Sequence, residues 1–289
     1  MRSEGAPNRP FIVNVAPTGA VADATKNPNV PLTPERIASD VTAAARAGAS
    51  IAHLHVRNPD GSPSCDPALF ERTLRAIRNV PACADLVLVV TTSGRHGQTT
   101  SQRAAVLELQ GAARPDMASL TLGSVDFRTG KSVNEPDTIR ILVDRMNAAG
   151  IKPELEVFAL SMIDFAKVLI AEGRLQPPYY FNIFLSEAGD LQADERHVRL
   201  ALERLPPNAI VSLAGIGRLQ ETATALGAAC ADGARIGLED NLWMDSSHTP
   251  ATNDALVRRI VAVATAIGRS IATPAWTRER LGLRANLTG

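Results

Sequence analysis

The sequence predicts a closed (β/α)8 TIM barrel with its functional site at the C-terminal ends of the strands. Three observations favour this fold class. The 289 residues suit a fold that typically takes about 250. Hydrophobic residues make up 45% of the chain, enough to bury a large core. Short β-branched runs alternate with helical segments eight times, which is the pattern of parallel strands closed into a barrel.

An open doubly wound sheet is the alternative fold. A glycine-rich dinucleotide loop after the first strand would favour it. The segment at that place, APTGA at residues 16–20, is not such a loop. We therefore expect a single barrel domain over residues 1–289, with short extensions at about residues 1–9 and 270–289.

The predicted strands are short runs rich in branched and aromatic residues. They cover residues 11–19, 51–56, 86–93, 117–123, 152–158, 179–185, 209–215 and 233–240. The first helix shows how the intervening segments are recognised, because Thr33 can cap it, Pro34 suits its first turn and Gly48 can end it. Further helices are expected at residues 66–78, 101–110, 135–149, 162–173, 194–205, 219–229 and 253–267.

Composition limits the classes of partner. Lys plus Arg and Asp plus Glu number 30 each, so no global field attracts nucleic acid or an anionic membrane. No apolar run approaches the ~20 residues of a membrane span. Three widely spaced cysteines, Cys65, Cys83 and Cys230, form no CxxC pair and suggest no disulfide framework. We expect a cytoplasmic protein.

Polar residues recur at alternate positions late in the predicted strands. Residues i and i+2 of a strand share a face, and barrel interiors are normally filled by Val, Ile and Leu. A buried charge is costly unless it is paired or bound to metal, so these positions mark a candidate site. They are His53 and His55, Thr91 and Ser93, Ser119 and Thr121, Glu154 and Glu156, and Arg235 with Glu239.

The sequence IAHLHVR at residues 51–57 predicts a metal site. Imidazoles at His53 and His55 lie about 6.5–7 Å apart at Cα, and their nitrogens can converge on one ion. Glu239, two strands away around the barrel, can complete a set that leaves coordination positions open, as in catalytic zinc sites. Iron(II) uses the same ligand types. Core histidines hydrogen-bonded to carboxylates are the alternative interpretation.

Asp240 follows Glu239 and is the candidate general base. An ion pair with Arg235 would keep the carboxylate ionised, although a purely structural ion pair is the alternative. The turn AGIGR at residues 214–218 has glycine N–H groups, and Arg218 adds charge, so it can bind an anion. A plain turn fits this segment equally well.

The motifs together resemble the β-keto acid cleavage enzyme family, whose known type is the 3-keto-5-aminohexanoate cleavage enzyme. The resemblance runs from about Arg9 to Leu283. It is carried by APTGA, by the PxTPE helix start, and by HLHVR, TTSG, PDMASLTLGSVDF, PELEVF, AGIGR and ARIGLEDN. It implies a zinc-dependent TIM barrel, a homo-oligomer (dimer or tetramer), and conversion of a β-keto acid and acetyl-CoA into acetoacetate and a new acyl-CoA.

Site roles follow from the resemblance. His53, His55 and Glu239 would bind the metal, and Asp240 with Arg235 would perform base catalysis. The segment carrying Thr91, Thr92 and Gly94 would hold the substrate carboxylate, while Ser119 and Glu156 would also contact substrate. Because CoA carries phosphates, Arg218 and Arg95 are candidate CoA contacts.

Two departures from the family pattern concern the distal substrate pocket. Val21 stands where members that act on the aminated keto acid have a glutamate, and residues 185–190 replace a GVPGG-like loop. An apolar side chain leaves an amine without its partner, at a cost of about 1–3 kcal/mol. We therefore expect a neutral or differently charged β-keto acid as the substrate.

Other classes of protein fit less well. Amidohydrolase-type zinc enzymes carry HxH on strand one and need further histidines on strands five and six, which this chain lacks. A lyase related to hydroxymethylglutaryl-CoA lyase would carry HxH on strand seven, where this chain has SLAGIG. A non-catalytic barrel would bind no metal and gives no reason for inward-facing charges.

Overall fold

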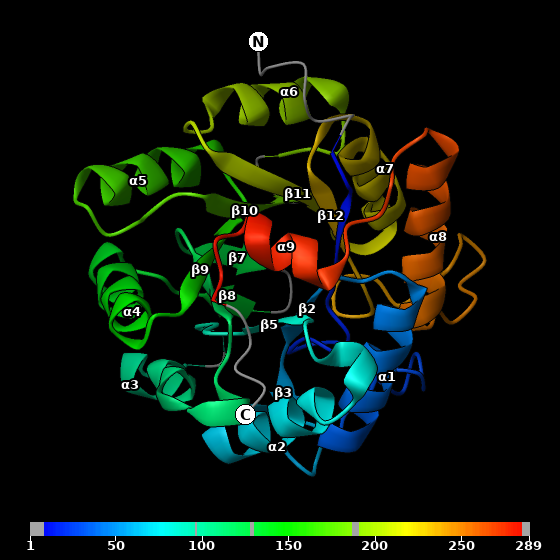
Figure 1. Cartoon of the computed structure of the whole chain (residues 1–289), viewed down its shortest axis with the longest axis horizontal. Coiled ribbons are helices and arrows are strands. Elements are labelled where there is room, and N and C mark those ends of the chain that lie inside the picture. Colours follow the sequence, from blue (N-terminus) through cyan, green and yellow to red (C-terminus); the bar gives the residue numbers. More distant parts are fainter. Residues whose placement is uncertain (1–8, 96, 128–129, 187–190, 285–289) are drawn as a thin grey trace.

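The computed structural model describes residues 9–95, 97–127, 130–186 and 191–284. Eight parallel strands close into a barrel in the order of the chain (Figure 1). The last strand pairs with the first, Ile12 opposite Gly233, so the predicted barrel is confirmed and the open sheet is excluded. The strands are β1 (Ile12–Val15), β2 (Ile51–Leu54), β5 (Val87–Val90), β6 (Met117–Thr121), β9 (Lys152–Val157), β10 (Tyr179–Leu185), β11 (Ala209–Gly215) and β12 (Gly233–Ile236).

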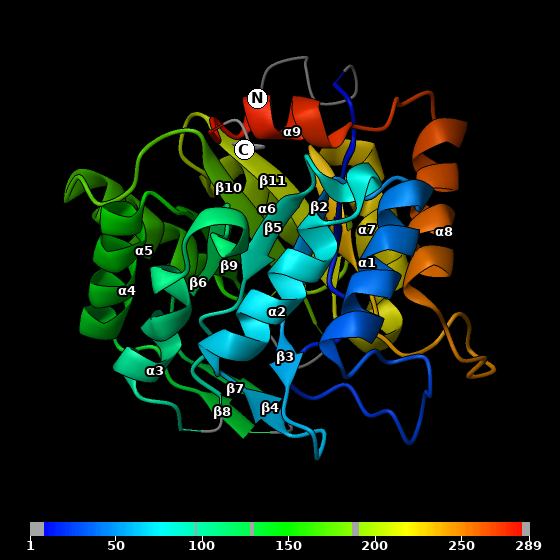
Figure 2. The same ribbon diagram turned by 60° about the horizontal axis from the view of Figure 1, so that its bottom comes forward.

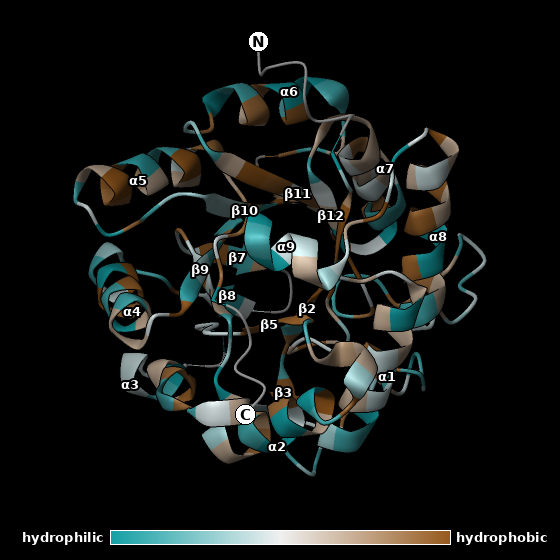
Figure 3. Cartoon of the chain, in the orientation of Figure 1, coloured by the Kyte–Doolittle hydropathy of each residue, from teal (hydrophilic) through white to brown (hydrophobic). Residues whose placement is uncertain are grey.

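An outer ring of helices surrounds the barrel (Figure 1). The Thr33 side chain caps the first helix by accepting from the Arg36 N–H, and Gly48 ends it at a φ of 119°. The helices of the ring carry both hydrophilic and hydrophobic residues (Figure 3), as expected of amphipathic helices. The ring comprises α1 (Pro34–Ala47), α2 (Pro67–Arg78), α3 (Thr100–Ala104), α4 (Pro136–Ala149), α5 (Leu160–Ala171), α6 (Glu195–Arg204), α7 (Gln220–Cys230) and α8 (Asn253–Ala266).

The third predicted helix is only partly right. A capping box between Thr99 and Gln102 begins α3, but the helix ends at Ala104 and continues as a 3-10 turn over Ala105–Glu108. Arg103 turns inward from this short helix and donates to the carbonyl of Thr92. The helix therefore supports the loop that follows β5.

A ninth helix, α9 (Pro274–Arg280), crosses the end of the barrel where the strands begin (Figures 1 and 2). Ala272 and Leu281 pack there on a layer of interior residues from the strand starts, among them Ile12, Ile51 and Met117. The described part of the predicted C-terminal extension is thus packed against the barrel. The predicted N-terminal extension lies almost entirely outside the described residues.

Two small hairpins extend from the opposite end (Figure 2). They are formed by β3 (Val56–Arg57) with β4 (Pro63–Ser64), and by β7 (Val125–Phe127) with β8 (Gly130–Ser132). The sequence pattern did not predict them. Since α9 closes one end of the barrel, the hairpin end is left for the functional site.

The remaining global expectations concern cysteines and membranes. Cys65, Cys83 and Cys230 are all free thiols, which confirms the prediction that they form no disulfide. Among the helices of the described segments, none has the length and apolar character needed to span a membrane.

Candidate active site

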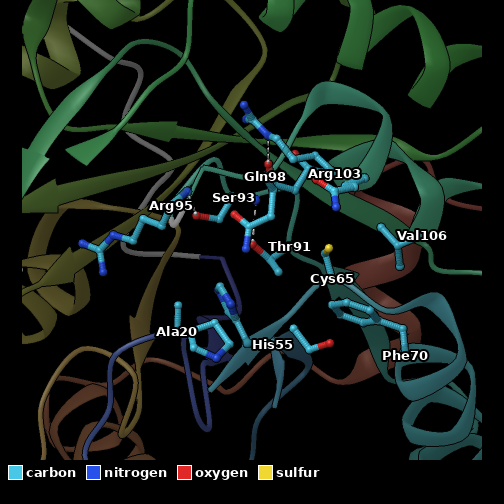
Figure 4. Close-up of a pocket in the computed structure, with 14 residues that line it drawn as sticks. Ala20, His55, Cys65, Phe70, Thr91, Ser93, Arg95, Gln98, Arg103 and Val106 are labelled. Atoms are coloured by element: carbon cyan, nitrogen blue, oxygen red, sulfur yellow. Dashed lines mark hydrogen bonds between the residues drawn. The ribbon is translucent and has the colours of Figure 1, made fainter. Parts of the chain in front are cut away.

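A cavity of about 560 Å³ opens at the C-terminal ends of the barrel strands, where TIM-barrel enzymes place their active sites. Nine of the residues to which the sequence assigned a specific role line it: Val21, His55, Thr91, Arg95, Glu156, Arg218, Arg235, Glu239 and Asp240. A smaller pocket adjoins it and shares Ala20, His55, Thr91, Ser93 and Arg95 (Figure 4). The structure therefore brings most of the predicted site together.

The segment after β12 departs from the predicted strand, which was expected to run to Asp240. The strand ends at Ile236, and Gly237 has a φ of 148°. A Cβ at Gly237 would lie 2.2 Å from the carbonyl oxygen of Ala16, so only glycine fits this close approach. In a continuous strand, consecutive residues would face opposite sides. The turn instead lets Glu239 and Asp240 both contact Arg235.

The predicted metal ligands converge. One ligand atom from each of His53, His55 and Glu239 lies within 4.8 Å of the other two, and the imidazole centroids are 5.4 Å apart. The Oε2 atom of Glu239 is buried without a hydrogen-bond partner, and such an atom is costly unless a cation or donor meets it. Both observations fit a divalent cation held by these three side chains.

The protonation states of His55 and Glu239 also suit a metal. Burial is the main influence on His55 and lowers the pKa of its imidazole, so the neutral, metal-binding form is favoured. Although burial opposes it, Arg235 and His55 hold the pKa of Glu239 well below its ordinary value. The ligand set thus combines an ionised carboxylate with a neutral imidazole at His55.

Glu154 orients His53. Its Oε2 atom lies 2.6 Å from Nδ1 of His53, while its Oε1 atom accepts from Asn14 at 2.8 Å and from Asn182 at 2.7 Å. With Nδ1 engaged, Nε2 of His53 is the nitrogen left for an ion. Metal-binding histidines commonly have such a partner on the other ring nitrogen. The sequence pattern marked Glu154 as inward-facing but assigned it no role.

A second grouping of His53, Glu154 and Glu156 also has ligand atoms within 4.8 Å of one another. It suits a metal less well. The 2.6 Å between Nδ1 of His53 and Oε2 of Glu154 is a hydrogen-bond distance, and ligands bonded to zinc at about 2.0–2.2 Å must lie farther apart to flank the ion. The His53, His55 and Glu239 set is therefore the candidate site.

Arg235 is the centre of the acidic cluster and is only 1% exposed. Its Nε donates to Asp240 at 2.9 Å, and two further nitrogens lie 2.8 Å from Glu239 and 3.4 Å from Glu156. Burial disfavours its charge, but these acids raise the pKa of the guanidinium well above its ordinary value. Arg235 thus stays charged and fixes three carboxylates.

The Arg235–Asp240 ion pair was predicted to keep Asp240 ionised. Burial raises the pKa of the Asp240 carboxyl above its ordinary value, and Arg235 offsets this only in part. The pair is therefore present, but its net effect differs from the expectation. A raised pKa moves Asp240 toward the range in which a carboxylate is an effective general base.

The predicted substrate-binding residues divide into two groups. Thr91 and Glu156 line the large cavity. Thr92 and Ser119 are buried instead, with the Thr92 hydroxyl donating to the Ser119 carbonyl at 2.6 Å. Gly94 packs against Arg103 and the Val133 carbonyl, each 2.7 Å from where a Cβ would be. None of these three residues lines the large cavity, although Thr92 lines the smaller pocket beside it. Their contacts support the loop that presents Thr91.

Two hydroxyl residues that were noted on the same strand faces do line the cavity: Ser93 and Thr121. The Thr121 hydroxyl donates to Glu156 at 2.7 Å. The alternation of the strands had already placed them on the inward face with Thr91 and Ser119. Position along the strand, nearer its C-terminal end, distinguishes Thr121 from Ser119.

The glycine turn after β11 does not offer the free N–H groups that were predicted. The Gly217 N–H donates to the Asp240 carbonyl at 2.7 Å, and the Ile216 N–H donates to the Leu185 carbonyl at 3.1 Å. The turn therefore positions Asp240. Arg218 still lines the cavity.

Val21 lies in the loop after β1 and is 38% exposed at the cavity. Arg57 holds this loop by donating to the carbonyls of Gly19 at 2.7 Å, Thr18 at 3.3 Å and Ala22 at 3.0 Å. Arg57 belongs to the HLHVR motif, but its role was not predicted. The second departure from the family pattern lies largely outside the described residues, since 187–190 are not described.

A closed parallel barrel whose strand ends meet in a charged cavity is the architecture typical of TIM-barrel enzymes. Residues 10–283 match the beta-keto acid cleavage enzyme family, and the chain belongs to this family, as its motifs led us to expect.

Two relatives each align with 95% of this chain. It is 36% identical over 279 residues to the 3-keto-5-aminohexanoate cleavage enzyme of Fusobacterium nucleatum, covering 98% of that protein. It is 37% identical over 278 residues to the 3-oxoadipate:acetyl-CoA acetyltransferase of Cupriavidus necator, covering 95% of that protein. The solved apo structure of ObcA has a similar fold, with a TM-score of 0.76 at 22% identity over 89% of this chain and 66% of that one.

Proposed function

We propose that this protein cleaves a β-keto acid with acetyl-CoA and produces acetoacetate and a new acyl-CoA. The observation that carries the proposal is the convergence of His53, His55 and Glu239 beside the Arg235–Asp240 pair. Family membership and the names of the relatives support the same reaction. The cavity is large enough for a keto acid and the end of an acyl thioester.

The cofactor in this proposal is Zn²⁺, or another divalent transition metal, held by His53, His55 and Glu239. When bound, the ion would supply positive charge next to the keto and carboxylate oxygens and so favour enolate chemistry. Glu154 would keep His53 oriented, and Arg235 would keep Glu239 in place.

Asp240 is the proposed general base, with Arg235 fixing its orientation. It removes a proton from the carbon between the substrate's two carbonyl groups, and that carbon attacks the thioester carbonyl of acetyl-CoA, which releases the CoA thiolate. The thiolate attacks the original keto carbonyl, the carbon–carbon bond breaks, and the electron pair remains on the departing acetoacetate carbon. Asp240 returns its proton there, so atoms and charges balance.

The substrate carboxylate would be held by the loop of Thr91 and Ser93, which Thr92, Gly94 and Ser119 support from behind. Glu156 would bind or orient the reacting groups from the opposite wall. Arg218 and Arg95 are the proposed contacts for CoA. We also propose a homo-oligomer, dimer or tetramer, in the cytoplasm, where free thiols persist; sedimentation of the purified protein tests the assembly.

The direct test is to incubate the metal-loaded protein with acetyl-CoA and a panel of β-keto acids. Mass spectrometry of the CoA products is expected to show a new acyl-CoA together with acetoacetate. Asp240→Asn should keep its metal and lose activity by about 10²- to 10⁴-fold, whereas His55→Ala should lose both metal and activity. Absence of acyl-CoA from every keto acid would refute the function, and full activity of Asp240→Asn would refute the base.

A further inference from the structure

Among the described residues, no carboxylate or carbonyl group binds the guanidinium of Arg95 in the cavity. Arg95 follows the TTSG segment, and it lines both the large cavity and the smaller pocket beside His55 and Thr91. Figure 4 shows it on the side of the small pocket opposite Cys65 and Val106. Within the segments that the structure describes, its guanidinium has neither a hydrogen bond nor an ion pair, whereas its backbone N–H donates to the Ser93 hydroxyl at 3.3 Å.

The guanidinium is nevertheless held in place. It stacks on the Phe127 ring with its central carbon 3.6 Å from the ring centroid. Phe127 in turn packs edge-on against Phe158 at 5.3 Å, and Phe158 stacks on Phe184 at 4.3 Å. A backbone bridge between Arg95 and Ser132 ties the loop to the hairpin that carries Phe127. A planar guanidinium fixed on an aromatic platform keeps its hydrogen-bond donors available for a carboxylate.

The position of Arg95 limits what it can bind. Arg95 lines the same cavity as Glu156, Glu239 and Asp240, at the reacting end. Burial lowers the pKa of its guanidinium, and these three acids act in the opposite direction. The phosphates of CoA stand at the far end of a long pantetheine arm from the thioester. An anionic group that binds Arg95 beside the metal ligands therefore belongs to the keto acid and not to the phosphates of CoA.

We infer that Arg95 is a carboxylate-binding residue for the β-keto acid, and that it does not contact CoA phosphates. This inference rests on the proposed function and replaces one of its two CoA contacts. The carboxylate is the one common to every β-keto acid, or the terminal one of a β-keto dicarboxylate. Both present the same group to a guanidinium, so the experiment must distinguish them.

The test compares Arg95→Gln with the parent protein on two keto acids of equal chain length, one of which carries a terminal carboxylate. The KM for keto acid should rise by about 10- to 100-fold, as expected on losing a charge-assisted hydrogen bond, while the KM for acetyl-CoA stays within about twofold. A rise for both keto acids identifies the common carboxylate. A rise only for the dicarboxylate identifies the terminal one.

Matched variants and a binding readout separate this role from a structural one. Arg95→Lys keeps the charge but loses the planar stack on Phe127, so its KM should lie between those of the parent and Arg95→Gln. Arg46→Gln, an exposed change near the C-terminal end of α1, should leave both KM values unchanged. Calorimetric titration of acetoacetate into the zinc-loaded protein measures binding without turnover. Because acetoacetate has only the common carboxylate, its binding should weaken to the same extent in Arg95→Gln if Arg95 binds that group, and should stay unchanged if Arg95 binds the terminal carboxylate, in which case only the KM for the dicarboxylate rises.

Two results would overturn the inference. One is a rise in the KM for acetyl-CoA with an unchanged KM for keto acid, since that would place Arg95 at the CoA phosphates. The other is unchanged KM values together with unchanged acetoacetate binding. Failure of the parent protein to convert any keto acid is a separate result, because it refutes the proposed reaction itself.

Discussion

The Nδ1 atom of His53 lies 2.6 Å from the Oε2 atom of Glu154, and both side chains are almost completely buried. Burial and Arg235 each act to lower the pKa of His53, but Glu154 and Glu239 together raise it above its ordinary value. The contact therefore does more than fill the barrel interior. It fixes the ring orientation and strengthens the imidazole as a ligand.

Glu154→Gln should weaken metal binding by about 10- to 100-fold, the usual effect of losing a carboxylate behind a metal-bound histidine. Competition with a chromophoric chelator measures this affinity directly. Glu156→Gln is the matched control, because it removes the same charge two residues along the strand without a hydrogen bond to His53. Equal zinc affinity of Glu154→Gln and the parent would contradict the assigned role of Glu154.

Metal binding should also stabilise the fold. A ligand that binds only the native state adds about 2.7 kcal/mol when its concentration is 100 times the Kd. We therefore expect the Tm in a thermal melt to fall when zinc is removed by a chelator and to recover when it is restored. His55→Ala should show no such shift. A Tm of the parent that is independent of zinc would count against the ligand set.

Arg57→Lys tests how the loop after β1 is held. A single ammonium cannot reach the carbonyls of Thr18, Gly19, Ala22 and Gly61 that the guanidinium reaches. Each carbonyl left unpaired costs about 1–3 kcal/mol, so the free energy of unfolding of the metal-free protein should fall by about that much or more.

The loop also touches the metal site, since a Cβ on Gly19 would lie 2.4 Å from Cγ of Glu239. Loosening it through Arg57→Lys should therefore weaken zinc binding as well. Arg36→Lys, an exposed change that affects one bond to the Pro28 carbonyl, is the control. Urea denaturation and zinc titration of both variants provide the comparison, and identical behaviour of the two would disprove the role of Arg57.

The sequence predicted the inward-facing residues of the barrel well, because the alternation of side chains along a strand is a local property. The spacing of His53 and His55 was sufficient to place both on the inward face, and the same rule marked Glu154. The rule failed where the backbone leaves the strand. Alternation places Asp240 opposite to Glu239, and only the turn at Gly237 brings them together on Arg235.

The sequence pattern also did not predict which side chains form hydrogen bonds with backbone carbonyls. Nothing in the spacing of Arg57 shows that it reaches carbonyls almost 40 residues earlier in the chain. Likewise, the hydroxyl of Thr92 could face substrate or a neighbouring strand, and the structure places it on the Ser119 carbonyl. Such choices depend on the three-dimensional neighbours of each side chain.

Gly237→Ala should disrupt the site through the backbone. The added Cβ would meet the Ala16 carbonyl at 2.2 Å, in addition to the cost of about 1–2 kcal/mol for a non-glycine residue at positive φ. Gly173→Ala is the matched control, because Gly173 also has a positive φ but has no atom within 4 Å of the added methyl. Chemical denaturation should show a clearly larger loss for Gly237→Ala, and equal losses would refute the close-approach argument.

Val21→Glu tests the substrate end of the cavity. Val21 is exposed there at the loop held by Arg57, and the apolar side chain offers no partner to a cationic amine. A carboxylate at this position should raise the kcat/KM for 3-keto-5-aminohexanoate relative to a neutral keto acid by about 10-fold, the lower end of the effect of a charge-assisted hydrogen bond. Val21→Gln, which has the same shape without the charge, should produce less than about a twofold change. Measured ratios that are equal for the glutamate and glutamine variants would show that this residue does not contact the distal end of the substrate.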